Sequence, residues 1–179
     1  MKRLILLRHA KSDWSDGAIR DFDRPLNSRG ERAAQLMGRW AAQQGLSCDM
    51  VIASPAVRVR ETLDHFRTAF PVCPEPHWER RLYLATAATL IEIVHEVSQH
   101  IDTVMLVGHN PGLEDLILDL VADDGLSTMR NSVEEKFPTT SIAALDCDVP
   151  DWHDVGTGAR FRYFARPRDL DVALGPQEG

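Results

Sequence analysis

The sequence of 179 residues has few cysteines, no excess of basic residues and no long apolar run. Its three cysteines, Cys48, Cys73 and Cys147, are an odd number without the spacing of a metal site, so we expect free thiols in a reducing cytoplasm. Acidic residues outnumber basic ones by 27 to 20, and the net charge of -7 argues against a general nucleic-acid-binding protein. Apolar stretches such as "MVIA" and "VMLVG" are too short to span a bilayer, so we expect no membrane partner.

Several motifs are also absent. No P-loop or dinucleotide-binding glycine pattern occurs, so a phosphate would not be held as in a nucleotide-binding loop. No carboxylates are paired at the spacing of metal ligands, and we therefore expect neither a metal nor a cofactor. The start "MKRLILLRHA" has only four apolar residues before Arg8 and no small-residue cleavage site, which favours a first strand over a signal peptide.

The residues that are present indicate an ordinary globular protein, with 44% hydrophobic and 26% charged residues. The length predicts one domain over 1–179, with a frayed tail from about 173. Short strand-like segments alternate with longer helix-like ones, which predicts an α/β fold, a three-layer α/β/α sandwich around a mostly parallel sheet. The expected strands are 3–7, 50–54, 75–79, 103–108, 141–146 and 159–165.

Four helices are indicated between these strands. The first should begin with a capping box formed by Ser28 and Glu31, and the second with Ser54 as its cap and a proline in its first turn. The third has an apolar stripe over 90–101, and the fourth follows Pro111. The polar loop over 9–28 is long enough to be functional, and 121–137 is expected to be a second, irregular insertion.

Unusual polar residues follow three of the predicted strands. Arg8 and His9 end the first, Arg58 lies in the first turn of the helix behind the second, and His109 and Asn110 follow the third. The carboxyl ends of parallel strands share one edge of a sheet, where ligands bind, so we expect these side chains to meet in one pocket. Arginines, an amide and helix N-termini are the donors that a phosphoryl group requires, and they would supply the charge that a metal supplies elsewhere.

Taken in order, these segments resemble motifs of the histidine phosphatase superfamily, which has the phosphoglycerate-mutase-like fold. The segment "LRHAKS" resembles the family's RHG motif, "SPAVRVRET" its second motif, and "VGHNPG" the motif of its second catalytic histidine. The late "FPTTSIAAL" strand and the closing "RPRDL" extend the resemblance over the whole chain, to the small phosphohistidine phosphatase branch. One departure is Ala10, which replaces the glycine of the RHG motif.

The resemblance implies roles for the residues that match these motifs. His9 would be the nucleophile and become transiently phosphorylated, Arg8 and Arg58 would bind phosphoryl oxygens, and His109 would complete the cradle. Asn110 and Thr140 would add hydrogen bonds, although Asn110 could equally serve only as a helix cap before Pro111.

The acid that would protonate the leaving group is open at this point. Larger relatives use a glutamate, and Glu79 lies in the corresponding stretch of this chain. Asp13, Asp16 and Asp21 on the long loop are alternatives, although Asp21 and Asp23 are equally expected to hold Arg20 or Arg24 in place.

We therefore predict a metal-independent phosphatase that acts through a phosphohistidine intermediate. Its expected substrate is phosphohistidine on a protein such as a phosphorelay domain, because the small chain lacks room for the long insertions that enclose small metabolites. The alternatives are a phosphatase or pyrophosphohydrolase of a small-molecule phosphate, and a phospho-binding module without enzymatic activity. We expect a cytoplasmic monomer.

Overall fold

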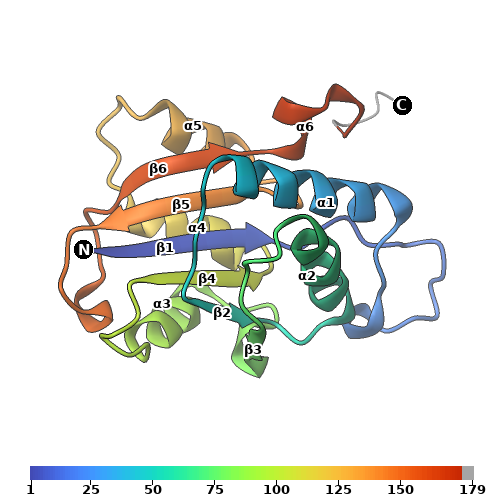
Figure 1. Cartoon of the computed structure of the whole chain (residues 1–179), viewed down its shortest axis with the longest axis horizontal. Helices are drawn as coiled ribbons and strands as arrows, with labels where there is room; N and C mark the ends of the chain where they lie inside the picture. The colour runs from blue at the N-terminus through green and yellow to red at the C-terminus, as the bar shows by residue number, and fades with distance from the viewer. Residues whose placement is uncertain (175–179) are drawn as a thin grey trace.

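The protein is built around one six-stranded sheet, seen in a computed structural model that describes residues 1–174. The strand order is β3-β2-β4-β1-β5-β6 (Figure 1). The strands are β1 (Lys2–Arg8), β2 (Met50–Ala53), β3 (Pro76–Trp78), β4 (Thr103–Gly108), β5 (Ile142–Cys147) and β6 (Arg160–Ala165). Strands β3, β2, β4 and β1 are parallel, whereas β5 runs antiparallel to both of its neighbours. Each strand lies within one residue of its predicted limits, and the mostly parallel α/β sheet is confirmed.

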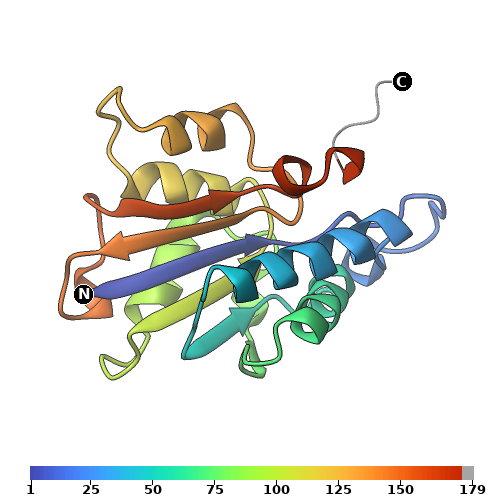
Figure 2. The same cartoon turned by 45° about the horizontal axis from the view of Figure 1, so that its top comes forward.

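Helices cover both faces of this sheet. They are α1 (Ser28–Gln43), α2 (Val57–Ala69), α3 (Ala87–His95), α4 (Gly112–Leu120), α5 (Thr128–Glu135) and α6 (Pro167–Leu170). Figure 2 shows α1 and α2 in front of the sheet and the helices of the opposite layer behind it. The period-two alternation of a strand explains this division, since Ile5 and Leu7 pack with α1 and α2, whereas Leu4 and Leu6 pack with α3 and α4.

Two predicted helix starts are displaced along the chain. Helix α1 already includes Ser28, so the preceding Asn27 is the cap and its side chain accepts a hydrogen bond from the N–H of Gly30. The predicted capping box is therefore wrong. Helix α2 begins at Val57 with Ala56 at the cap position and no side-chain cap. The hydroxyl of Ser54 lies 2.8 Å from Nε2 of His109 and accepts from the N–H of Ala56 at 3.4 Å.

The segment 121–137 is not irregular, because it contains α5. The side chain of Ser127 caps this helix, and Val133 is its buried apolar residue. With eight residues and two apolar ones, Met129 and Val133, α5 is too short for its pattern to predict a helix from the sequence.

The tail predicted to fray from about 173 is partly ordered. Residues Val172–Leu174 form a short 3-10 helix, and the carbonyl of Leu174 accepts a hydrogen bond from Arg29. The remainder, 175–179, lies outside the described residues. Within residues 1–174, no helix has both the length and the apolar character needed to cross a bilayer.

Candidate functional site

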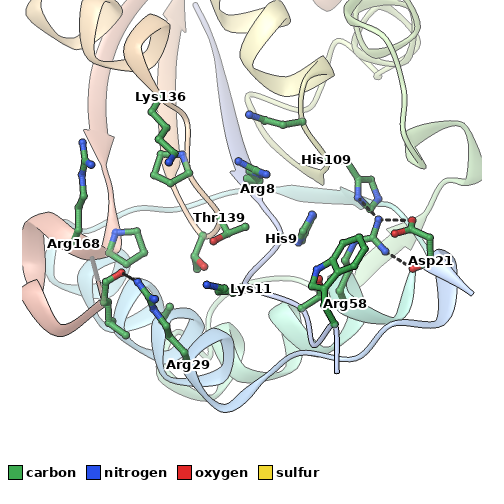
Figure 3. A pocket seen from close by; sticks show the side chains of 18 of the residues that line it. Arg8, His9, Lys11, Asp21, Arg29, Arg58, His109, Lys136, Thr139 and Arg168 are labelled. Carbon is green, nitrogen blue, oxygen red and sulfur yellow. Dashed lines mark hydrogen bonds and ion pairs between the residues drawn. The ribbon is translucent and has the colours of Figure 1, made fainter. Parts of the chain in front are cut away.

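A cavity of about 750 Å³ lies at the carboxyl ends of the parallel strands β1 and β4. Arg8, His9, Arg58 and His109 all line it (Figure 3). The first two come from the end of β1, Arg58 from the first turn of α2, and His109 from the residue after β4. The structure therefore brings together four residues that lie up to about a hundred positions apart in the sequence.

His9 is held so that one ring nitrogen is free. Its backbone N–H donates to the carbonyl of Gly108 at 3.0 Å, and its Nδ1 lies 2.7 Å from the carbonyl oxygen of Ala10. A carbonyl only accepts hydrogen bonds, so Nδ1 carries the hydrogen and Nε2 keeps a lone pair. His9 is only 9% exposed, and this burial lowers its pKa to about 4. The hydrogen bond to Ala10 raises the pKa, whereas the positive charges of Arg58 and Arg8 lower it further.

His109 has the opposite tautomer. Its Nδ1 lies 3.2 Å from Nη2 of Arg58, and its Nε2 lies 2.8 Å from the hydroxyl of Ser54. A guanidinium only donates, so Nδ1 accepts and the Nε2–H donates to Ser54. Burial, followed by the proximity of His9 and Arg58, lowers the pKa of His109 to about 3. The two imidazoles, with ring centroids 5.1 Å apart, are therefore both neutral at pH 7.

Arg58 is almost completely buried and is oriented by Asp21. Its Nη2 donates to Oδ2 of Asp21 at 3.0 Å, and the hydroxyl of Tyr83 donates to the same oxygen at 2.7 Å. Partial burial raises the pKa of Asp21, but the hydrogen bonds from Tyr83 and Arg58 and the positive charge outweigh it and leave the pKa below its ordinary value. Asp21 is therefore an ionised carboxylate beside the cavity.

The loop acids also have the contacts expected from the sequence. Asp23 pairs with Arg20 at 2.6 Å, and Asp21 lies 3.9 Å from Arg24. The stronger contact of Asp21 with Arg58 spans 37 positions, and only the unusual length of the loop hinted at such a role.

Arg8 and Asn110 converge on one backbone carbonyl, that of Phe137. Nη1 of Arg8 donates to it at 2.7 Å, and Nδ2 of Asn110 donates to it at 3.1 Å and to Oε2 of Glu114 at 2.9 Å. The amide hydrogens of Asn110 are thus engaged within the protein, and Pro111 takes the cap position of α4. Asn110 therefore fixes the segment before β5 with both hydrogens of its side-chain amide, and its hydrogen bond to a phosphate stays a prediction.

Thr140 lines the cavity but exposes none of its surface. Its backbone N–H donates to the carbonyls of Arg8 at 3.0 Å and His9 at 3.1 Å. Its φ of 66° is in the left-handed region, which is costly for a β-branched residue and is found where a site constrains the backbone. Thr140 therefore holds the end of β1 through its backbone N–H. Its buried hydroxyl has no hydrogen-bond partner among the described residues, and the hydrogen bond to phosphate expected from the sequence stays a prediction.

Ala10, which departs from the family's glycine, fits without strain on the site. It is fully buried, and its N–H donates to Oγ1 of Thr62 at 2.8 Å.

The structure does not bring Glu79 to this cavity, contrary to the expectation that it supplies the acid. Glu79 follows β3 at the sheet edge and lines a different cavity. Its carboxylate accepts hydrogen bonds from the backbone N–H and Nη2 of Arg81, both at 2.9 Å, which lower its pKa. Asp13 and Asp16 are not among the lining residues, so Asp21 is the one carboxylate in the described lining.

No three His, Cys, Asp or Glu side chains within 1–174 lie together as the ligands of a metal ion would. The charge at the described cavity comes instead from arginine and lysine side chains.

A buried neutral imidazole beside two arginines, at the carboxyl edge of a doubly covered sheet, defines an α/β protein with a cationic cavity whose chemistry suits an anion. Comparison with known proteins gives the same class. The family model of the histidine phosphatase superfamily (branch 1) matches residues 4–82. An uncharacterized protein of Mycobacterium tuberculosis is 38% identical over 153 residues, which cover 85% of this chain and 93% of the relative.

Two solved structures are similar over nearly the whole chain. SixA from Agrobacterium tumefaciens, a candidate phosphohistidine phosphatase, is 30% identical with a TM-score of 0.77, over 93% of this chain and 99% of its own. The corresponding candidate from Nakamurella multipartitia is 28% identical with a TM-score of 0.79, over 93% and 96% of the two chains. The chain belongs to the histidine phosphatase superfamily, and its structural neighbours are of the small phosphohistidine phosphatase branch.

Proposed function

We propose that this protein is a phosphatase whose nucleophile is Nε2 of His9. The observation that carries the proposal is the tautomer of His9, because the hydrogen bond to Ala10 leaves a neutral Nε2 lone pair in a cavity lined by cations. Arg8 and Arg58 bind the phosphoryl oxygens, and His109, which lies beside Arg58, completes the cradle.

The reaction has two displacements at phosphorus. Nε2 of His9 forms a bond to phosphorus while the bond to the leaving group breaks. A leaving imidazole already carries the proton on its ring and departs neutral, whereas an alkoxide takes its proton from water. The ring of His9, which keeps its Nδ1–H, then carries a positive charge that the Ala10 carbonyl stabilises. Water next attacks phosphorus, the P–Nε2 bond breaks, and neutral His9 and inorganic phosphate result. No step needs a metal ion.

The substrate we propose is phosphohistidine on a protein, such as a phosphorelay domain. An alkoxide leaving from a phosphate ester needs a proton in the transition state, whereas an imidazole protonated on its ring leaves with little help. The described lining holds one carboxylate, Asp21, whose depressed pKa keeps it from donating a proton near pH 7. The similarity to SixA structures supports the same substrate.

A small-molecule phosphate is a second candidate, favoured by the size of the cavity, which at about 750 Å³ lies in the range of small-ligand sites. For either substrate we propose a cytoplasmic monomer. Its three cysteines are buried free thiols, which suits a reducing compartment.

The test is trapping of the intermediate together with the kinetics of His9→Ala. Rapid mixing with labelled substrate and an alkaline denaturing quench should leave the label on Nε2 of His9, stable in alkali and lost in acid. His9→Ala should lose at least three orders of magnitude in kcat/KM, whereas His77→Ala, at an exposed position outside this cavity, is the matched control. If His9→Ala retains more than about a tenth of the wild-type rate, the nucleophile is another group.

A further inference from the structure

The cavity extends well beyond the four residues of the phosphoryl cradle. Its volume of about 750 Å³ is far more than one phosphoryl group occupies. Figure 3 shows Arg58, His109 and Asp21 on one side of His9, and Arg29, Lys136 and Arg168 on the other, with Lys11 between them and His9. We call these four side chains, Lys11, Arg29, Lys136 and Arg168, the outer cations.

The outer cations come from four separate parts of the chain. Lys11 lies on the loop after β1, Arg29 is in the first turn of α1, and Lys136 and Arg168 follow α5 and begin α6. Four segments of the chain therefore direct positive charge into one half of the cavity, which lysines scattered over a surface would not do.

Most of this charge has no partner among residues 1–174. Lys11, Lys136 and Arg168 form no ion pair or side-chain hydrogen bond with any residue between 1 and 174. Arg29 is anchored by the carbonyl of Leu174 and so is held at the cavity wall. Elsewhere arginines are paired readily, as Arg67 is with Glu75 and Arg81 is with Glu79 and Glu96.

The contrast with the rest of the molecule strengthens this observation. The protein has a net charge of -7, yet six of the residues that line this cavity are Arg or Lys and one, Asp21, is acidic. Asp21 is already bound to Arg58. An acidic protein that gathers Lys11, Lys136 and Arg168, which have no partner among the described residues, around a concave site concentrates anions there.

We infer that the outer cations form a second anion subsite, which binds an anionic group that the substrate carries beside its scissile phosphoryl group. This inference rests on the proposed phosphatase activity. The second group is a phosphate or carboxylate, borne by a small molecule or by an acidic side chain next to a phosphohistidine. The subsite makes the protein selective for substrates with two anionic groups, and a single phosphate ester uses only half of the cavity.

The first measurement compares matched substrates of the unmodified enzyme. We would use 4-(phosphonomethyl)phenyl phosphate, which has a second, non-hydrolysable anion, against 4-ethylphenyl phosphate, which has a similar phenol leaving group and no second charge. Because the phosphonate adds a second charge-assisted contact in a partly exposed site, we expect kcat/KM to be about tenfold higher for the first substrate, mainly through a lower KM. The preference should shrink as salt is raised.

The second measurement removes the outer cations and keeps the cradle. The double variant Lys136→Gln/Arg168→Gln should bring the ratio of the two kcat/KM values close to one. The matched control, Arg39→Gln/Arg160→Gln, removes two exposed charges that do not line the cavity and should keep the tenfold ratio. Phosphohistidine peptides with flanking Asp or flanking Asn then show which source of the second anion the enzyme prefers.

The outcomes separate the two hypotheses. If no substrate is turned over, the proposed phosphatase activity fails, and calorimetry of the same two aryl phosphates with His9→Ala still measures the subsite. The second anion subsite is refuted if the two aryl phosphates have equal kcat/KM values or equal affinities and the peptides with flanking Asp and flanking Asn have equal kcat/KM values. A ratio that survives in Lys136→Gln/Arg168→Gln would also refute the assignment to these side chains.

Discussion

Acidification should destabilise this protein through the two histidines of the cavity. His9 and His109 have pKa values of about 4 and about 3 in the folded protein, against 6.5 for an ordinary histidine, because both rings are buried. In the unfolded chain they take up protons as the pH falls below 6.5, and in the folded protein they do not. The unfolded state therefore binds more protons in this window, and stability must decrease as the pH decreases.

The magnitude follows from these pKa values. On going from pH 7.5 to pH 5.0, each histidine should remove about 2 kcal/mol from the free energy of unfolding. The assay is urea unfolding at both pH values, for the wild type, His9→Gln and His109→Gln. The pH-dependent loss should be about 2 kcal/mol smaller in each variant than in the wild type. The exposed His100→Gln is the control for the substitution itself.

The same reasoning predicts where activity should decline. His9 must be neutral to attack phosphorus, so kcat/KM should hold down to about pH 5 and fall only below it. If His9→Gln and His109→Gln lost as much stability on acidification as the wild type, the two rings would not be held neutral by burial. The tautomer argument for His9 would then lose its basis.

Three further predictions follow from the site and its surroundings. Glu79→Gln should leave kcat/KM unchanged on phosphohistidine and on aryl phosphate alike, because Arg81 holds this carboxylate at another cavity; a selective loss on the ester would restore it as the acid. Activity should survive EDTA and gain nothing from added Mg²⁺ or Zn²⁺, and loss on chelation with recovery by one metal would contradict the proposed chemistry. Gly30→Ala should lower the free energy of unfolding by about 1–3 kcal/mol in urea, because the new Cβ would lie 2.3 Å from the carbonyl oxygen of Lys11. Gly17→Ala is the control, since a Cβ at that position would have no other atom within 4 Å.

Much of the fold was decided by local patterns in the sequence. The run "LILL" in β1 alternates between the two helical layers, and any sequence with such strands and amphipathic helices between them forms a covered, mostly parallel sheet. The helix starts were less certain, because Asn27 and Ser28 are both good caps and only the backbone of the preceding loop chooses between them. Helix α5 escaped prediction because it buries few apolar side chains.

The sequence by itself also determined which residues meet at the site. Arg8, His9 and His109 follow parallel strands directly, and Arg58 lies in the first turn of the helix after β2, so the topology alone carries them to one edge of the sheet. The order of the motifs was sufficient to indicate the family. No long-range contact had to be known for either conclusion.

Only the tertiary structure decided the chemical state of these residues. The free nitrogen of His9, the opposite tautomer of His109 and the orientation of Arg58 depend on Ala10, Ser54 and Asp21. Likewise, the position of Glu79 away from the cavity depends on where β3 pairs at the sheet edge. The outer cations meet only because the loop after β1, the starts of α1 and α6 and the end of α5 surround one space. Hydrogen-bond partners and burial come from contacts between distant segments, and a one-dimensional pattern does not specify them.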